Sequence, residues 1–151
     1  MRRDRGRRAQ GEGTGAQVTL RVELVAPDGE VWSGRARMVI AKTLDGDIGV
    51  LTGHPPVLGV LAEGSLVRIL DPEDAGGESG EVVAAVNGGF LSIADDRVSV
   101  LCREAQLGPQ VDRAAVRASL DAALEEGQGG DEEPAEVKYS RALLRAAGEP
   151  S

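Results

Sequence analysis

The sequence predicts a mainly β protein with an α-helical tail. Between residues 18 and 104, short apolar runs of alternating hydrophobicity recur and are separated by turn residues, as in antiparallel sandwiches and barrels. Glycine occurs 21 times among 151 residues, which suits a chain with many tight turns. After residue 104 the apolar spacing becomes helical. We therefore expect a β-sandwich domain over 18–104 and a helical hairpin over 105–151.

About nine short strands are expected in the first of these domains. In the first strand, Leu20, Val22 and Leu24 alternate with polar residues, and Pro27-Asp28-Gly29 ends the run. Asp95-Asp96 is the expected final hairpin turn, and the polar, glycine-rich residues 71–80 are expected to form a loop. The expected strands are 18–25, 31–34, 37–41, 48–51, 57–61, 65–70, 82–87, 90–94 and 97–101.

Two helices are expected after Leu107-Gly108-Pro109. Asp112 is a suitable N-cap for the first helix, in which apolar residues recur at helical spacing until glycines at 127–130 end it. Pro134 can open a second helix over 135–147, which Gly148 and Pro150 stop. Both helices are short and weakly apolar, so they must pack against the sandwich or against another protein.

The charge distribution narrows the classes of partner. The net charge is −8, although residues 1–17 contain five arginines against two acids. We interpret 1–17 as a disordered basic extension, and the acidic remainder argues against nucleic acid as a partner. No apolar run approaches the roughly 20 residues of a membrane span, and no secretory signal is evident. We expect a soluble intracellular protein that meets a membrane only through a partner.

The segment from Asp45 to Pro56 holds the sole histidine, His54, among glycines and two prolines. Glycine permits unusual backbone angles and proline stiffens an extended exit, so this segment specifies a shaped surface. Catalysis by His54 would need a nucleophile, yet the single cysteine, Cys102, is remote in sequence and no Gly-x-Ser-x-Gly elbow occurs. No phosphate loop or metal-ligand spacing is present either. A small hydrolase using His54 is therefore disfavoured, whereas a β-sandwich module that binds a ligand or peptide stays open.

Several segments, taken in order, resemble the epsilon subunit of bacterial F-type ATP synthases. They are Val31-Trp32-Ser33-Gly34, the run from Gly46 to Leu58, Leu61-Ala62-Glu63-Gly64 and Gly88-Gly89-Phe90-Leu91. The resemblance covers residues 18–126. It implies an antiparallel ten-stranded β-sandwich followed by a two-helix hairpin. It also implies a non-catalytic subunit of the central stalk, which couples proton-driven rotation to ATP synthesis and can restrain ATP hydrolysis.

The resemblance also implies partners and contact residues. In the family the sandwich binds the gamma subunit and the ring of c subunits, and the helices can reach the alpha/beta catalytic head. The complex lies on the cytoplasmic face of the bacterial plasma membrane. Contacts are implied at Asp47, Gly49, Gly53, His54 and Pro55. Among these, Asp47 would face the c-ring and His54 would lie near the gamma subunit.

The chain departs from the family at the start of the first helix. Members that bind ATP have an acidic residue followed, three positions later, by an Arg-Ala pair. Here the frame is Val111-Asp112-Arg113-Ala114-Ala115-Val116, so the pair is missing. We therefore expect no cofactor and poor ATP binding. The second helix is also short and its linker long, so we expect little restraint of hydrolysis.

Overall fold

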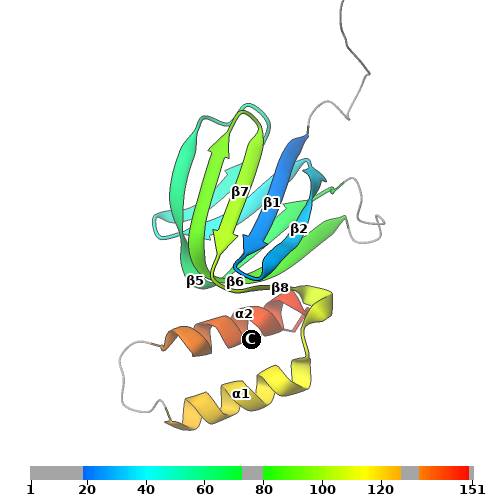
Figure 1. Ribbon diagram of the computed structural model, residues 1–151. Helices are drawn as coiled ribbons and strands as arrows, with labels where there is room; N and C mark the ends of the chain where they lie inside the picture. Colours follow the sequence, from blue (N-terminus) through cyan, green and yellow to red (C-terminus); the bar gives the residue numbers. More distant parts are fainter. Residues whose placement is uncertain (1–18, 73–79, 127–132, 150–151) are drawn as a thin grey trace, which may run out of the picture.

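The computed structural model describes residues 19–72, 80–126 and 133–149. In these ranges eight strands form a folded sheet, and two helices stack beneath one end of it (Figure 1). The strands are β1 (Leu20–Ala26), β2 (Gly29–Ala36), β3 (Met38–Thr43), β4 (Gly46–Val50), β5 (Val57–Leu70), β6 (Glu81–Ala94), β7 (Arg97–Cys102) and β8 (Ala105–Leu107). The expected basic extension 1–17, most of the loop 71–80 and the glycines at 127–130 lie outside the described residues.

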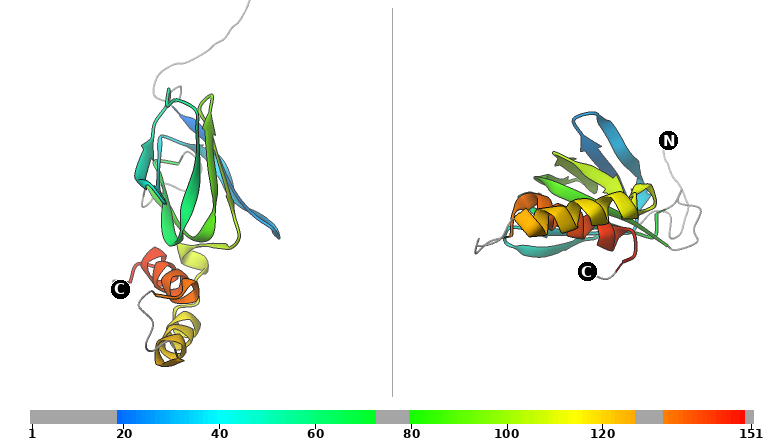
Figure 2. Two further views of the ribbon diagram at one scale, coloured as in Figure 1. Left: turned by 90° about the vertical axis from the view of Figure 1, so that its left-hand side faces the viewer. Right: turned by 90° about the horizontal axis from the view of Figure 1, so that it is seen from below.

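The sheet closes into two layers because two long strands bend. Its order is β2-β1-β7-β6-β5-β3-β4, and β8 adds to β6. β5 and β6 each have 14 residues, and their pairing shifts register between Glu63 and Ser65. Each of these strands therefore contributes its two halves to different layers, which the side view separates (Figure 2). A β-bulge gives this kind of local bend without ending the ladder.

The predicted fold class is confirmed, but three details differ. The ten strands implied by the resemblance are eight, because 57–61 with 65–70, and 82–87 with 90–94, each form one bent strand. Counting both halves of β5 and β6 separately gives ten segments. The sheet is also not wholly antiparallel, since β1 pairs with β7 in parallel. β8 continues the sheet beyond position 104 as far as Leu107.

The core between the layers is aliphatic, as the scarcity of aromatic residues requires. Leu20, Val22 and Leu24 of β1 are fully buried, which confirms the predicted alternation. Cys102 is buried in the same cluster, where its thiol donates to the carbonyl oxygen of Val25 at 3.4 Å. Burial raises the pKa of this thiol from 9.0 to about 11. The cysteine is therefore a protonated core residue at neutral pH.

α1 begins, and α2 begins and ends, where their sequence signals predict, whereas the predicted stop of α1 at 127–130 lies outside the described residues. α1 (Arg113–Glu126) is capped by Asp112, whose carboxylate accepts from the Ala115 amide at 3.1 Å. α2 (Ala135–Ala146) ends where Gly148 takes a φ of 96°. The Gly148 amide donates to the oxygen of Arg145 and the Glu149 amide to that of Leu144, each at 2.9 Å. This pair of bonds is a Schellman motif, for which glycine is the favoured residue. Neither helix is long and apolar enough to cross a membrane.

α2 lies between the sheet and α1 (Figures 1 and 2). On the sheet side, Ala142 and Leu143 are buried against Ala85 of β6. On the other side, Val137 and Leu144 form a small cluster with Leu120 of α1. The expectation that the helices lean on the sandwich is thus met directly by α2, and α1 packs on α2.

Two glycines set how closely α2 approaches the sheet. A Cβ atom at Gly64 would lie 2.4 Å from the carbonyl carbon of Lys138. A Cβ atom at Gly108, in the short 3-10 turn Gly108–Gln110, would lie 2.2 Å from the oxygen of Ala146. Real Cβ atoms essentially never come this close, so both ends of α2 lie against positions that only glycine can occupy in this arrangement.

Candidate functional site

The loop that follows β4 is fastened to the turn between β6 and β7. The Gly53 amide donates to the Asp96 carboxylate at 2.6 Å, and the His54 amide donates to the Leu51 oxygen at 3.2 Å. The His54 ring contacts the Pro55 carbonyl oxygen through Nδ1 at 2.8 Å. The turn lies at the end of the sandwich away from the helices (Figure 1). The ring is thus held against its own loop, which fits a shaped contact surface.

Asp47 and Gly49 lie elsewhere, on the edge strand β4. Asp47 pairs in register with Lys42 of β3, and its side chain is exposed. It borders a cleft of about 330 Å³, near the bend of β5, together with Arg68 and with Arg145 of α2. A Cβ atom at Gly49 would lie 3.0 Å from the Met38 methyl group. The five expected contact residues therefore form two separate groups, one on β4 and one at the far end of the sandwich.

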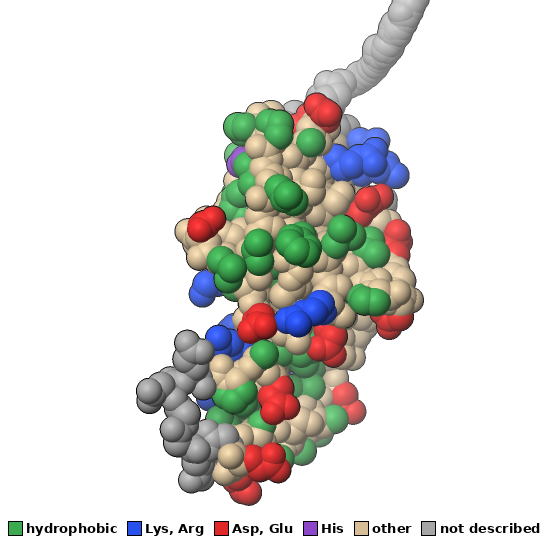
Figure 3. All heavy atoms as spheres, turned by 60° about the vertical axis from the view of Figure 1, so that its left-hand side comes forward, with side chains coloured by type: hydrophobic (Ala, Val, Ile, Leu, Met, Phe, Trp, Pro, Cys, Tyr) green, Lys and Arg blue, Asp and Glu red, His purple; other side chains and the backbone are tan. Residues whose placement is uncertain are grey.

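A row of exposed apolar side chains crosses one layer of the sandwich. Val60, Phe90 and Leu101 are direct neighbours across β5, β6 and β7. Leu58 lies two residues before Val60, and the Leu44 amide donates to the Val60 oxygen at 2.9 Å. The exposed fractions in this apolar face are Leu58 77%, Leu44 71%, Phe90 54%, Leu101 53% and Val60 45%. Figure 3 shows hydrophobic side chains gathered over the sandwich, with charged side chains toward its borders. Large contiguous exposed apolar patches on soluble proteins mark sites that bind proteins, membranes or ligands.

Sequence reasoning missed the apolar face, although a signal was present. In β5 and β6 apolar residues occupy both alternating positions, so that Leu61 and Leu91 are buried while Val60 and Phe90 are exposed. A strand with one solvated face should have polar residues at the second set of positions. The apolar residues at this second set of positions indicated that another molecule covers the outer face of these strands. Asp96 was expected only as a turn residue, and its bond to Gly53 depends on tertiary structure.

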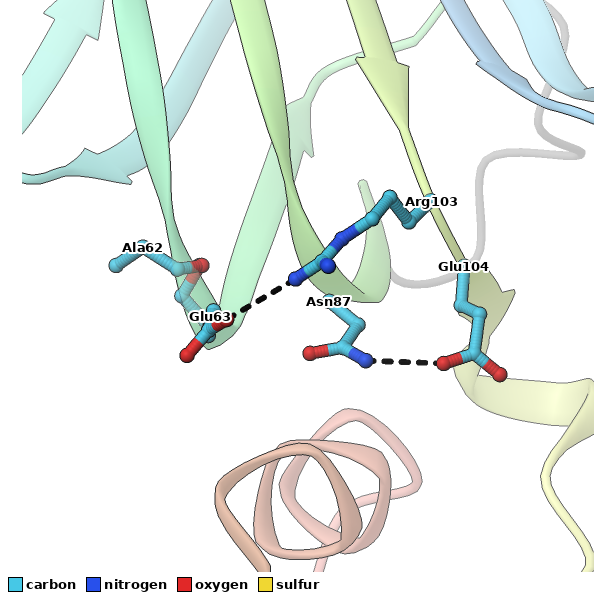
Figure 4. A network of polar contacts seen from close by, with 6 residues as sticks. Ala62, Glu63, Asn87, Arg103 and Glu104 are labelled. Atoms are coloured by element: carbon cyan, nitrogen blue, oxygen red, sulfur yellow. Dashed lines mark hydrogen bonds and ion pairs between the residues drawn. The ribbon is translucent and has the colours of Figure 1, made fainter. Parts of the chain in front are cut away.

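A polar network lies on the sandwich where it faces α2 (Figure 4). Arg103 pairs with Glu63 at 3.0 Å, and the Asn87 amide nitrogen donates to Glu104 at 2.9 Å. The Asn87 amide oxygen is buried without a partner among the described residues. Burial, and then the nearby charge of Glu104, raise the pKa of Tyr139 on α2 to about 12. These contacts connect the bends of β5 and β6 with the segment that follows β7.

A basic cleft of about 550 Å³ is lined by residues of α2 and of the bend of β5. Its border includes Lys42, Arg103, Lys138, Arg141 and Arg145, with acidic groups at Glu63 and Glu133. Two of these cations form ion pairs: Arg103 with Glu63, as above, and Arg141 with Glu133 at 2.8 Å.

The other arginines that could have served a nucleotide are engaged elsewhere. Arg113 donates to the Ala147 oxygen, and Arg117 pairs with Glu149. Across the described ranges, no three His, Cys, Asp or Glu side chains come together as a possible metal site.

Comparison with known proteins matches the whole sandwich to one family. The sequence model of the family described as ATP synthase, Delta/Epsilon chain, beta-sandwich domain matches residues 19–108. The chain is 50% identical to the ATP synthase epsilon chain of Thermobifida fusca over 129 residues, which covers 85% of this chain and 91% of the relative. It is 45% identical to that of Streptomyces avermitilis over 127 residues, covering 83% and 97%.

The same fold occurs in a solved structure. A chain in the Euglena gracilis mitochondrial ATP synthase, in the structure of its OSCP/F1/c-ring, superimposes with a TM-score of 0.60 at 24% identity. The superposition covers 89% of this chain and 79% of that one. At this identity the likeness bears on the fold alone.

Proposed function

This chain belongs to the ATP synthase delta/epsilon family, and we propose that it is a rotor subunit of the central stalk. It is a non-catalytic part of the ATP synthase complex. In this role the sandwich connects the gamma subunit to the ring of c subunits, so that proton-driven rotation is transmitted to ATP synthesis. The observation that supports the proposal most strongly is the apolar face, because a subunit held within an assembly must have a surface for its neighbour.

The apolar face is proposed as the contact for the gamma subunit. Its exposed leucines and phenylalanine would together lose a large apolar area on binding, and each fully buried side chain of this size stabilises by roughly 1.5–3 kcal/mol. The loop of Gly53, His54 and Pro55 leads directly into β5, whose residues Leu58 and Val60 belong to the face. His54 is therefore proposed to lie at the border of the gamma contact.

Asp47 is proposed as the contact for the c-ring. It is an exposed carboxylate on an edge strand, and Gly46 and Gly49 near it allow close approach of another backbone. A carboxylate at this position can pair with basic loop residues of the ring. Because Asp47 and His54 belong to separate groups, two partners fit the geometry better than one.

The C-terminal helices are proposed to face the alpha/beta catalytic head when they leave the sandwich. We further propose that the assembled subunit works on the cytoplasmic face of the bacterial plasma membrane, peripherally, through the complex. ATP and other cofactors are not part of the proposal.

Co-purification from the native membrane fraction tests the assembly. The intact chain should bring down the large ATPase subunits, and Leu58→Glu or Phe90→Glu should weaken this by about 10- to 100-fold, as expected for loss of a central apolar contact. Leu124→Glu is the matched control, because Leu124 is an exposed leucine on α1 outside the apolar face. Equal effects of all three changes would contradict the assignment of the face.

The alternative function, an independent β-sandwich that binds a ligand or peptide, makes a different prediction for the same experiment. A chain that co-purifies with no ATPase subunit would favour it over a rotor subunit.

Proton pumping in reconstituted membranes tests the contact residues. Asp47→Lys should reduce coupled pumping while leaving the isolated fold intact, since the side chain is exposed. His54→Ala should weaken gamma binding without loss of any chemistry. Unchanged coupling with Asp47→Lys would remove the c-ring assignment.

A further inference from the structure

α1 makes few buried apolar contacts with the rest of the described chain. It is the outermost layer, separated from the sheet by α2 (Figure 1). Leu120 is its one buried residue, and it packs with Val137 and Leu144 of α2. Cooperative units with few buried apolar contacts open at lower free energy than the rest of a protein. Other interactions must therefore contribute to holding α1 in place.

Four residues at the open end of the hairpin supply these interactions, and we call them the latch: Arg113, Arg117, Ala147 and Glu149. Arg113 donates to the Ala147 oxygen and lies 3.9 Å from the Glu149 carboxylate. Arg117 pairs with the other oxygen of Glu149. Glu149 is only 20% exposed, whereas both arginines are more than half exposed.

The arginines of the latch break a local rule, which indicates that their contacts matter. The N-terminal turn of a helix favours acidic residues, because its unpaired amides and dipole are positive. α1 instead has Arg113 in its first turn and no acid there. The same arginine lies at the C-terminal end of α2, where a cation is favoured. The unfavourable position of Arg113 on α1 is therefore offset by its favourable position at the C-terminal end of α2.

The end of α2 is shaped to present Glu149 to α1. Gly148 turns the chain through its positive φ, and the Schellman bonds return the next residue toward the helix. A Cβ atom at Gly148 would lie 3.8 Å from the Arg113 guanidinium, so the turn passes directly beside α1. The latch thus follows from the helix stop encoded in the sequence.

We propose that the latch decides whether α1 stays packed on α2, and that on its release α1 loosens while α2 stays seated on the sheet. α2 is fixed independently by the close approaches at Gly64 and Gly108 and by its cluster with Ala85. Release exposes the apolar side of α1 around Leu120. This inference goes beyond the proposed function and is measured on the isolated full chain.

Hydrogen exchange of the full chain tests the order of opening. Glu149→Gln keeps the side-chain shape and removes its charge, and it should speed exchange of the α1 amides by about three- to tenfold, the effect of losing exposed ion pairs. Amides in the middle of α2 should change little. Raising the salt to about 1 M, where the Debye length is about 3 Å, should reproduce the effect in the unmodified chain. Glu125→Gln is the matched control, an equal change at an exposed acid on α1.

Thiol labelling distinguishes release of α1 from fraying of the chain end. In a Cys102→Ala background, Ala123→Cys places a thiol in the contact between the helices. Its labelling should accelerate with Glu149→Gln by the same factor as α1 exchange. Adding Arg117→Gln to Glu149→Gln should produce little further change, because both remove one interaction.

Three outcomes would overturn the proposal. The first is unchanged α1 exchange in Glu149→Gln, or an equal response in Glu125→Gln. The second is an equal rise across α1 and α2, which would mean that the hairpin opens as one unit. The third is faster exchange only at the end of α2 with unchanged labelling, which would mean simple fraying.

Discussion

Replacing Gly64 by alanine perturbs the contact between α2 and the sheet at one defined residue, Lys138. The added Cβ would lie 2.4 Å from the Lys138 carbonyl carbon and 2.6 Å from its oxygen. Ordinary contact begins at 3.4 Å, so Lys138 must retreat by about 1 Å. Both atoms belong to backbone within α2, and no flexible side chain can give way. The helix must shift, tilt or undock.

The expected cost has two parts. Gly64 has a φ of 63°, and a residue with a Cβ in this left-handed region costs roughly 1–2 kcal/mol. Overpacking of a close contact typically costs a further 1–3 kcal/mol. Gly80→Ala isolates the first part, since its φ is 67° and its added Cβ would meet the Asp71 carboxylate at an ordinary 3.6 Å. The difference in unfolding free energy between the two variants therefore measures the cost of overpacking the contact between Gly64 and α2.

Urea unfolding and hydrogen exchange together give the assay. Gly64→Ala should lower the free energy of unfolding by roughly 2–5 kcal/mol and Gly80→Ala by roughly 1–2 kcal/mol. Exchange in α2 should rise more in Gly64→Ala than the global loss explains, because the helix is displaced locally. If both variants lost the same unfolding free energy and hydrogen exchange in α2 were unchanged, the close contact between Gly64 and α2 would be refuted.

Four further outcomes are expected. Because the pKa values of Cys102 and Tyr139 are raised from 9.0 and 10.0 to about 11 and 12, the folded state holds these protons more tightly. The stability that these two groups contribute should therefore be fully present below pH 9 and be lost as the pH rises toward 12. Unfolding midpoints measured across this range should fall less in Cys102→Ala. Truncation after Gln110 should leave a cooperative β-type unfolding transition, whereas truncation after Glu104 also removes β8 and should lower the midpoint further in the same melts. Calorimetric titration should give ATP affinity weaker than low micromolar, since Arg113 and Arg117 are engaged by α2; a tight isotherm would contradict this. Deletion of residues 127–151 should change ATP hydrolysis by the assembled enzyme less than about tenfold, under about 1.4 kcal/mol of barrier, and a larger activation would mean that the helix restrains the enzyme.

The positions of strands and helices were predictable because each depends on local pattern and capping. Alternation located β1, and Asp112 and Gly148 located the ends of the helices through bonds that span only a few residues. The continuity of β5 through Glu63 and Ser65 was not predictable. A polar turn sequence and a bulge use the same residues, and only the pairing with β6 decides between them.

The candidate site was only partly predictable, because its parts meet through tertiary structure. The loop at Gly53 and His54 was recognised from its composition, yet its anchor, Asp96, is 43 residues away in the chain. The expected contact residues looked continuous in sequence, but Asp47 belongs to an edge strand and His54 to the far end of the sandwich. The latch forms only when the two ends of the hairpin meet, and no local sequence pattern predicts that contact.

The arrangement separates partner binding from any motion of the helices. α2 covers Leu66 and Ala85, in the halves of β5 and β6 that form one layer. The apolar face, including Val60 and Phe90, belongs to the other halves of the same strands. Release of α1 would thus leave both layers as they are, and release of α2 would uncover only the first layer, so the apolar face would be unchanged in either case. A rotor contact made through that face would persist in every state of the hairpin, so changes in the helices can alter hydrolysis without loosening the coupling between subunits.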